Sequence, residues 1–580
     1  MNPLPAASAL VLAFLVLAAR PAAGGDKDDF PKAHKAFLAA MQKAAVAESA
    51  FWKEMPKRLR DAYETYRKQW QEWYGKQDAP PDIFYDLSGY KRLYGEAGEL
   101  GRVQGEAAGT LAASADGLEA AKAVWKELLA AIDRSAKAEK QLKDARVVQD
   151  DYHIDQTIPL RLQVAESHRK GLVEALGRFA DPEALAFLAG KAWEEACAAD
   201  KKTSDVRRRL ALVEGLGANL SEAAFAFLRA RRAEPALFLR AAALHGIARF
   251  KDAHREEVLE AALKALKDEK PFSIRVAALK IVETLKAVKA VGALIEVLRA
   301  EVETKEGGIL CGHLIRVLRD LTGKDYGISW ENWQGWYGKH KEELEKGTVS
   351  KEGGDDGAGA GEKKEKTVTF YNIPTYSKGI IILIDASDTL VIPADLDIAR
   401  QHSVFYWLEA SKKKLEQYQS QLDVLKEEAA KAIEAMDDHT WFNVILLGKD
   451  DRKEACWPGM MPASAENKKK AQKMFAEARP GGWAPQFEGL LEAFRIAGMD
   501  PYASEFEAPS ADTFYLLTDG GICGGRYMTP NAIVEAVRQL NRYRNATVHT
   551  IQIANLGPDA EELLKGLAEA TGGSYVWRKK

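Results

Sequence analysis

The stretch Gly379-Ile380-Ile381-Ile382-Leu383-Ile384-Asp385-Ala386-Ser387-Asp388-Thr389 contains more information about the fold than any other part of the chain. Its first six residues are apolar and rich in Ile, which is typical of a strand buried on both faces of a parallel α/β sheet. The polar residues follow directly, so we expect them in the crevice beyond the strand's carboxyl end, where such sheets bind ligands. Asp385, Ser387 and Thr389 alternate along the chain, so their oxygens can converge, and oxygen ligands suit Mg²⁺.

The rest of the last third repeats an alternation of strands and helices. Further strands are expected at residues 441–448, 514–520 and 548–553. Helical patterns lie between or after them, at residues 422–436, 468–478, 487–497, 531–543 and 560–571. This alternation over roughly 200 residues predicts an α/β fold with a doubly wound, mostly parallel sheet.

The ordered motifs of this region resemble those of a known family. Asp385-x-Ser387-x-Thr389 resembles the first motif of the metal-ion-dependent adhesion site in von Willebrand factor A domains, with Thr389 in place of the last Ser. Asp519, at the end of the 514–520 strand, resembles the family's distal aspartate. The resemblance covers about residues 367–580. It implies that Asp385, Ser387, Thr389 and Asp519 hold Mg²⁺ or Mn²⁺.

One loop departs from the family pattern. Members of the family usually place a metal-coordinating Thr in a Gly-rich loop before the third helix, whereas the loop at 481–485 has Ala484 at that place. A methyl group has no lone pair to donate, so one ligand is lost unless water replaces it. Mg²⁺ commonly keeps several waters, so the loss weakens the predicted site without removing it. The alternative is a degenerate domain that makes protein contacts without a metal.

About thirty residues are inserted after the first motif, at 390–421. Residues 398–421 are rich in Lys, Glu, Gln and aromatic residues, which favours an added or lengthened helix. Because the insertion adjoins the predicted site, it is either a cap or partner surface, or an elongated solvated helix.

The amino terminus has the pattern of an export signal. Residues 6–19 are apolar and uncharged, and small residues follow at 22–25. The apolar run is too short to span a bilayer, so residues 1–24 are predicted to be a cleaved signal peptide. We therefore expect an exported protein of the periplasm, cell envelope or extracellular space. Later segments are not apolar enough for a membrane span in the mature chain.

Charge and cysteine content argue against nucleic-acid binding and against a structural zinc site. The 82 basic and 85 acidic residues give a net charge of −3, which offers no general attraction for nucleic acid. The four cysteines are far apart and form no C-x-x-C pair, so a structural zinc site is not predicted. Whether Cys456 and Cys523 form a disulfide is left open by the sequence.

The chain before the α/β region is predicted to be helical throughout. Residues 26–150 read as a helical hairpin or coiled-coil arm. Residues 160–345 contain similar segments that begin at Arg169, Arg209, Arg240 and Arg275, and they resemble a HEAT-like α-solenoid. A Trp-rich helix at 326–344 is expected to cap it, and a plain helical bundle is the alternative. Residues 347–366, rich in Gly, Asp, Lys and Glu, read as a flexible linker.

Two classes of function compete. The first is a non-catalytic binding or scaffold protein, in which the helical repeats and the A-type domain contact protein partners. The second is an enzyme, because Asp385-x-Ser387-x-Thr389 after an apolar strand is also similar to the Asp-x-Asp-x-Thr pattern of haloacid dehalogenase phosphatases, with Asp385 as nucleophile. Ser387 replaces the second carboxylate of that pattern, which favours the binding protein.

Overall fold

The protein is described by a computed structural model. The described residues are 30–75, 87–115, 117–145, 155–203, 205–303, 308–346, 368–370, 372–395, 398, 407, 419–448, 452–500, 509–522, 524–553 and 557–578. The predicted signal peptide, the 347–366 linker, Cys523 and most of the 390–421 insertion lie outside them. None of the described helices is both long enough and apolar enough to cross a bilayer.

The chain forms two compact units. The helical unit comprises residues 1–67 and 86–254, and the mixed unit comprises residues 68–85 and 255–580. This division differs from the one expected from the sequence, which separated the two halves at residues 347–366. The last helices before the linker belong to the same unit as the sheet, so the A-type domain is not joined to them by the linker alone.

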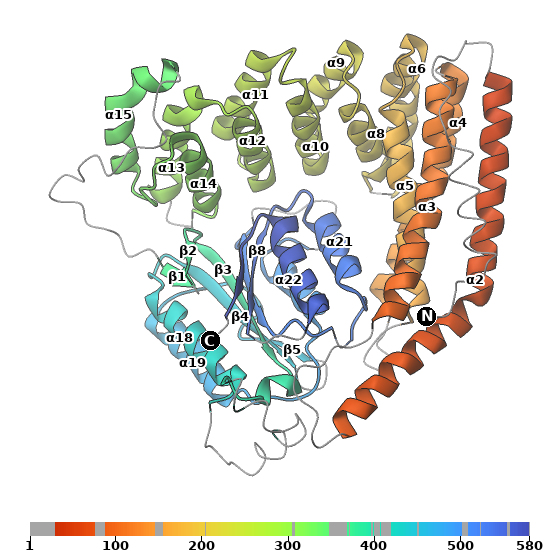
Figure 1. The fold of residues 1–580 in the computed structure, drawn as a ribbon. Helices are drawn as coiled ribbons and strands as arrows, with labels where there is room; N and C mark the ends of the chain where they lie inside the picture. Colours follow the sequence, from red (N-terminus) through yellow and green to blue (C-terminus); the bar gives the residue numbers. More distant parts are fainter. Residues whose placement is uncertain are drawn as a thin grey trace. The chain divides into compact units, whose positions relative to one another are not determined.

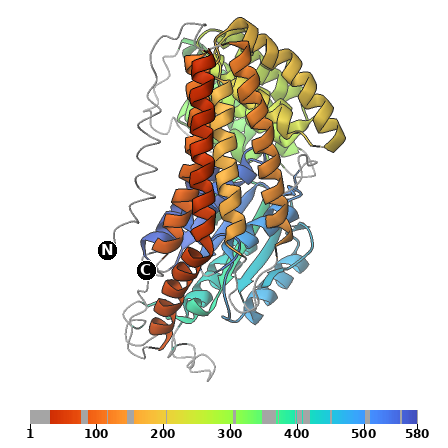
Figure 2. The same ribbon diagram turned by 90° about the vertical axis from the view of Figure 1, so that its right-hand side faces the viewer.

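Four long helices begin the helical unit, and α3, α4 and α5 run side by side in both ribbon views (Figures 1 and 2). They are α2 (Phe30–Gly75, in this unit as far as Arg67), α3 (Ser88–Ser114), α4 (Leu118–Asp144) and α5 (Thr157–Leu176). Along α2 the buried side chains recur at spacings of seven and four residues, at Phe37, Ala44, Phe51, Met55, Ala62 and Tyr66. This is the spacing of a coiled-coil seam, and the paired arm stays a prediction.

Short helices follow in the same unit. They are α6 (Pro182–Phe187), the π-helix η2 (Leu188–Ala192), α7 (Trp193–Thr203), α8 (Arg207–Gly217), α9 (Glu222–Arg231), α10 (Leu237–Ile247) and the 3₁₀ turn η3 (Ala248–Phe250). Helix α8 packs against both α5 and α10, so three of the four segments that the sequence aligned are neighbours in space. A stacked arrangement of this kind buries faces that one helix pair cannot bury alone. Their assignment to HEAT-type repeats stays a prediction.

The mixed unit begins with more helices. They are α11 (Arg255–Asp268), α12 (Phe272–Thr284), the 3₁₀ turn η4 (Val288–Ala290), α13 (Val291–Glu303), α14 (Cys311–Thr322) and α15 (Trp330–Lys346). Helix α15 packs on α13, and it buries Trp333 completely and Trp336 almost completely. The Trp333 Nε1 donates a hydrogen bond to the Gly327 carbonyl at 3.0 Å. These rings are therefore packing groups, as the predicted cap requires.

Two sheets complete the mixed unit. The small antiparallel one pairs β1 (Val368–Phe370) with β2 (Ile373–Thr375). The large one has the order β5-β4-β3-β7-β8-β9, with β6 beside β4. Its strands are β3 (Gly379–Ala386), β4 (Trp441–Gly448), β5 (Arg452–Ala455), β6 (Met461–Pro462), β7 (Thr513–Thr518), β8 (Thr547–Gln552) and β9 (Tyr575–Trp577). All its pairings are parallel except those of β5 and β6 with β4, so the predicted mostly parallel sheet is confirmed.

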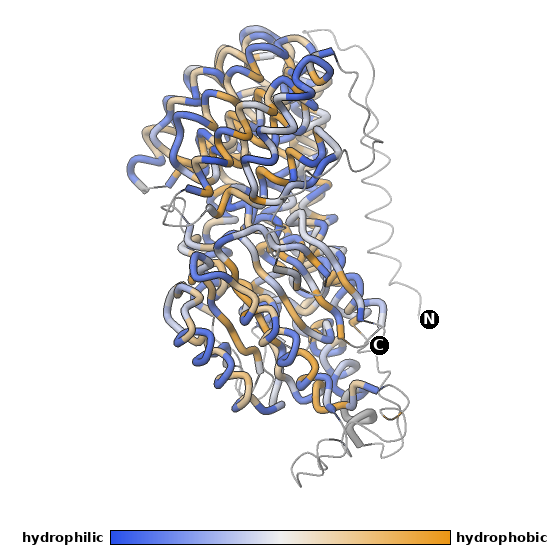
Figure 3. Tube along the Cα trace, turned by 90° about the vertical axis from the view of Figure 1, so that its left-hand side faces the viewer, coloured by the Kyte–Doolittle hydropathy of each residue, from blue (hydrophilic) through white to orange (hydrophobic). Residues whose placement is uncertain are grey.

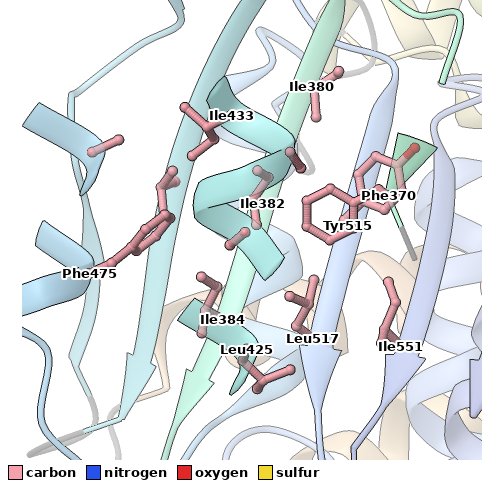
Figure 4. Close-up of a cluster of buried hydrophobic side chains, with 14 of the residues drawn as sticks. Phe370, Ile380, Ile382, Ile384, Leu425, Ile433, Phe475, Tyr515, Leu517 and Ile551 are labelled. Carbon is pink, nitrogen blue, oxygen red and sulfur yellow. The ribbon is translucent and has the colours of Figure 1, made fainter. Parts of the chain in front are cut away.

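Helices cover both faces of the large sheet (Figure 1). They are α18 (Gln421–Ala435), α19 (Ala465–Glu477), α20 (Gln486–Ile496), α21 (Pro530–Asn541) and α22 (Pro558–Thr571). On one face, Ile380, Ile382 and Ile384 of β3 meet Leu425 of α18 and Phe475 of α19 (Figure 4). On the other face, Phe494 of α20 packs edge-on against Phe514 of β7, with ring centroids 5.2 Å apart.

The burial of β3 on both faces explains its composition. Every residue of this central strand is buried, and the hydropathy colouring shows the strands as hydrophobic segments (Figure 3). A strand that packs helices on both sides needs apolar side chains at every position instead of at alternate ones. The first polar side chains after Ile384 therefore lie at the strand's carboxyl end.

Candidate functional site

The predicted site residues gather at the carboxyl ends of two adjacent strands. Strand β3 lies between β4 and β7. After β3 the chain adds β4 next to one long edge of β3, and it later adds β7 next to the opposite edge. This is the point where the strand order reverses, and doubly wound sheets bind ligands there. Asp385 is the second-last residue of β3, and Asp519 follows β7 directly.

Asp385 is held by hydrogen bonds from the turn after its own strand and from the neighbouring strand β7. Its side chain is inaccessible to solvent. The Ser387 backbone N–H donates to Oδ1 at 2.8 Å, and the Thr518 hydroxyl donates to Oδ2 at 2.5 Å. The first bond closes the turn after β3, and the second ties β3 to β7. The position of this carboxylate is therefore fixed by the sheet itself.

Asp519 joins the same cluster through the predicted hydroxyls. The Gly521 backbone N–H donates to its Oδ1 at 2.9 Å, and the Thr389 hydroxyl donates to its Oδ2. The Thr389 Oγ1 lies 3.0 Å from the Ser387 Oγ. The structure thus brings Asp385, Ser387, Thr389 and Asp519 together, as the sequence predicted.

The two carboxylates oppose each other's ionisation. Burial, and then the charge of Asp519, raises the pKa of Asp385 to about 7. Burial also raises the pKa of Asp519. Two buried carboxylates at one point retain a proton unless a positive charge replaces it. A cation is the ligand that this cluster favours electrostatically.

The facing loop approaches the cluster through backbone contacts. The Gly481 N–H donates to the Ala386 carbonyl at 2.9 Å, and the Asp388 N–H donates to the Gly482 carbonyl at 3.1 Å. Gly482 has φ of +65°, a conformation that glycine adopts without strain. Ala484, two residues later, is 2% exposed. The loop that supplies a hydroxyl in the family that the sequence resembles therefore packs beside the site, and it carries a buried Ala at residue 484.

Two residues of the site were not found from the sequence. Thr518 is fully buried and links the strands through Asp385, as described above. Gln486 is also buried, and its Nε2 donates to the Gly521 carbonyl at 2.6 Å. This bond connects the start of α20 to the loop that follows Asp519. No sequence spacing identifies either residue, because each acts across a strand or loop that is distant in the chain.

The donor set suits a hard cation with few protein ligands. Two carboxylates and two hydroxyls converge, and these are oxygen donors of the kind that Mg²⁺ and Mn²⁺ accept. Among the residues that the structure describes, no group of three or more His, Cys, Asp or Glu side chains is placed to hold a metal. Binding here would therefore depend on the hydroxyls of Ser387 and Thr389 and on water.

Comparisons with known proteins agree with this fold. Residues 410–577 match the family described as von Willebrand factor type A domain, which is fewer than a third of the 580 residues. The matched range contains Asp519 and Ala484, and Asp385 lies upstream of it. No curated protein matches the chain.

One solved structure that resembles the chain is the von Willebrand factor type A protein from Catenulispora acidiphila. The identity is 19% and the TM-score is 0.24, over 36% of this chain and 40% of the other. The chain thus covers less than half of that protein. The similarity rests on the family match, since the matched range contains β4 and β7, the two strands that pair with β3. Residues 410–577 are therefore similar to a von Willebrand factor type A domain.

Proposed function

We propose that the chain is an exported binding protein of the cell envelope, whose A-type domain contacts protein partners through the crevice beyond β3 and β7. The observation that carries the proposal is the convergence of Asp385, Ser387, Thr389 and Asp519 at the switch point of the sheet. A site built from the ends of rigid strands presents the same geometry to each partner, and a fixed geometry suits the recognition of a protein partner.

A divalent cation is part of the proposal. Mg²⁺ or Mn²⁺ would be held by the two carboxylates and the two hydroxyls, and it would supply a positive charge at the mouth of the crevice. The remaining coordination positions would be open to water or to an acidic side chain of a partner. Such a partner would bind less well once the cation is removed.

A binding role fits the site better than a catalytic one. Asp385, the nucleophile of a phosphatase mechanism, is fully buried, and each of its carboxylate oxygens accepts a hydrogen bond. Its pKa, raised to about 7, leaves much of it protonated near neutral pH, which weakens a carboxylate nucleophile. Asp519, the second carboxylate of the cluster, is also buried and held by Thr389 and Gly521.

Export is proposed from the amino-terminal segment alone. Its apolar run and small residues fit cleavage near residue 24. The intact mass of the protein from its native host tests this, since the mature chain should lack about residues 1–24. A mass that includes Met1 would contradict export by this route.

The binding function is tested by capture on the immobilised full chain from an envelope extract. We expect proteins that are retained in Mg²⁺, released by chelator and not retained by Asp385→Asn. The exposed Asp438→Asn is the matched control and should retain them. An identical set of retained proteins with chelator and with Asp385→Asn would contradict cation-dependent recognition.

A further inference from the structure

The amino ends of the same strands contact the helices that precede the linker, within the mixed unit. Lys280 of α12 donates from its Nζ to the Asn545 Oδ1 at 2.6 Å, just before β8. The Tyr376 hydroxyl, before β3, donates to the Asp325 carboxylate at 3.1 Å. At Gly379 a Cβ would lie 3.1 Å from the Ile309 Cγ2, so backbone and side chain pack closely there. These contacts lie at the amino ends of the strands, opposite to the carboxyl ends that carry Asp385 and Asp519.

A buried polar group lies at the centre of this contact. The His313 Nε2 of α14 lies 3.6 Å from the Asp512 Oδ2, at the start of β7. The other carboxylate oxygen, Oδ1, accepts hydrogen bonds from the hydroxyls of Ser377 and Thr513. Asp512 is 1% exposed and His313 is 9% exposed, and Nε2 has no hydrogen-bond partner among the described residues. Asp512 is thus the acidic group that faces this ring.

Neither member of the pair is stable as an isolated charge. Burial, and then Arg316 and Lys280, lowers the pKa of His313 to about 3. Burial raises the pKa of Asp512 to about 7. Between about pH 3 and pH 7 the two side chains therefore bind one proton in total, whichever of them carries it.

Further charged side chains near the pair come from α12, α13, α14 and the segment before β3. Glu283 of α12 pairs with Arg316 of α14 at 2.8 Å. Other charged or titratable side chains act on the neighbouring Cys311, namely those of Glu301 on α13, Arg275 on α12 and Lys378 before β3. Since acidic and basic groups are mixed, the local field does not fix the protonation of the pair by itself.

We propose that His313 and Asp512 together bind one proton and form a buried latch, a polar contact between the A-type domain and helix α14 that keeps its stability over a wide range of pH. The unfolded chain also binds one proton at these two residues between the ordinary pKa values of Asp and His. Folding then moves the proton without gaining or losing one, so the pair adds little pH dependence to stability. A lone buried His or Asp in the same place would not have this property.

Removing one partner exposes the pH dependence of the other, with opposite signs. In Asp512→Asn, His313 stays neutral in the folded state but is protonated in the unfolded state below its ordinary pKa. Stability is then lost as pH falls from 6.5 to 4.5. In His313→Gln, Asp512 keeps a proton that the unfolded state has released, so stability is lost as pH rises from 4.5 to 6.5. Each unfolding constant should change by up to about 50-fold over this interval.

The test is chemical denaturation of the full chain at pH 4.5, 5.5 and 6.5, with each variant compared with the wild type. The two single variants should show opposite slopes, and the double variant should follow the wild type. The solvent-accessible pair of half-buried His254 and exposed Glu222, with Nε2 and Oε1 2.9 Å apart, is the matched control. His254→Gln and Glu222→Gln should leave the slope nearly unchanged because solvent reaches both side chains.

Slopes of the same sign in the two single variants, or no change in either, would overturn the proposal. If Asp512→Asn does not fold, His313→Gln alone decides the question, since only the predicted loss of stability with rising pH agrees with a shared proton. Cation binding at the crevice is not measured here, so failure of the latch leaves the proposed function standing.

Discussion

At the scale of single residues, Asp385 shows how the sheet prepares a binding site. A carboxylate at the end of a fully buried strand is removed from water, and Asp519 adds a second negative charge close by. Protein hydrogen bonds fix the positions of both side chains. The oxygen atoms are therefore in place before any cation binds, and a cation would displace the proton that the two carboxylates retain.

Ala484 is the residue where one substitution should strengthen cation binding. Ala484→Thr places a hydroxyl on the loop that packs beside the cluster, so Mg²⁺ affinity should rise about tenfold. Ala484→Val has nearly the same shape without the hydroxyl, and it should not bind more tightly than wild type. Calorimetric titration of both variants measures this difference. Equal gains in the two would trace the effect to packing and not to coordination.

His549 on β8 should make the domain sensitive to acid. Its ring stacks on Tyr515 with centroids 4.9 Å apart, and its Nδ1 accepts a hydrogen bond from the Ser574 N–H at 3.0 Å. Burial lowers its pKa to about 4, so its contribution to stability is present above the ordinary His pKa and is lost as pH falls. Between pH 6.5 and 4.5 the unfolding constant of the wild type should therefore rise about 40-fold more than that of His549→Gln.

The measurement is thermal or chemical denaturation of the full chain, and the exposed His439→Gln is the control. If His549→Gln and His439→Gln change the pH dependence equally, the ring of His549 is not the group responsible.

The motif residues of the site were predictable, and their supports were not. Asp385, Ser387 and Thr389 follow an unmistakable buried strand, and Asp519 ends another. Thr518 and Gln486 have no such pattern, because their roles come from hydrogen bonds to residues 133 and 35 positions away. The same holds for His313 and Asp512, which lie in different elements and meet only in the folded chain.

At the scale of elements, glycines set the distance between α3 and α5. A Cβ at Gly105 would lie 2.6 Å from the Gly171 Cα, so the two helices approach at these positions without side chains. Gly105→Ala should push the helices apart and reduce stability by about 1–3 kcal/mol. Gly95, in the same helix, has open space around its Cβ direction. Gly95→Ala should be neutral or stabilising, by up to about 1 kcal/mol.

Denaturant unfolding of the two variants tests the packing of these helices directly. A loss of stability in Gly95→Ala as large as that in Gly105→Ala would contradict the close approach.

Long patterned elements were predicted well and short edge elements were missed. Strand β4 has the predicted bounds, and α18 to α22 start or end within about three residues of prediction. The strand β5 was not predicted, because Arg452-Lys453-Glu454-Ala455 has no apolar alternation and lies at the edge of the sheet. The β1–β2 pair was missed for a related reason, since three residues per strand carry too little pattern.

At the scale of the whole molecule, the contacts of the mixed unit change what cleavage should do. The sequence of the 347–366 linker predicts cutting there by proteases. The α12 and α14 contacts with the amino ends of the strands should nevertheless hold the fragments together. The cut chain should therefore elute from a sizing column at the position of the intact protein. Separate elution of a fragment that starts near Lys364 would show that these contacts are too weak to matter.

The proposed cation site and the latch occupy opposite ends of β7. Asp512 precedes this strand and Asp519 follows it, so the helix contact and the proposed cation site use opposite strand ends of one sheet. The proposed partner would then reach the cation site without displacing α12 or α14.

The central claim is that the clustered oxygens hold a divalent cation, and calorimetric titration of the full chain with Mg²⁺ and Mn²⁺ tests it most directly. The wild type should bind with measurable heat and melt at a higher temperature in millimolar cation, since a ligand of the folded state alone stabilises it. Asp385→Ala should lose both effects because the hydroxyls cannot replace its carboxylate. Neither heat nor thermal shift in the wild type would contradict the claim and leave a metal-independent contact domain.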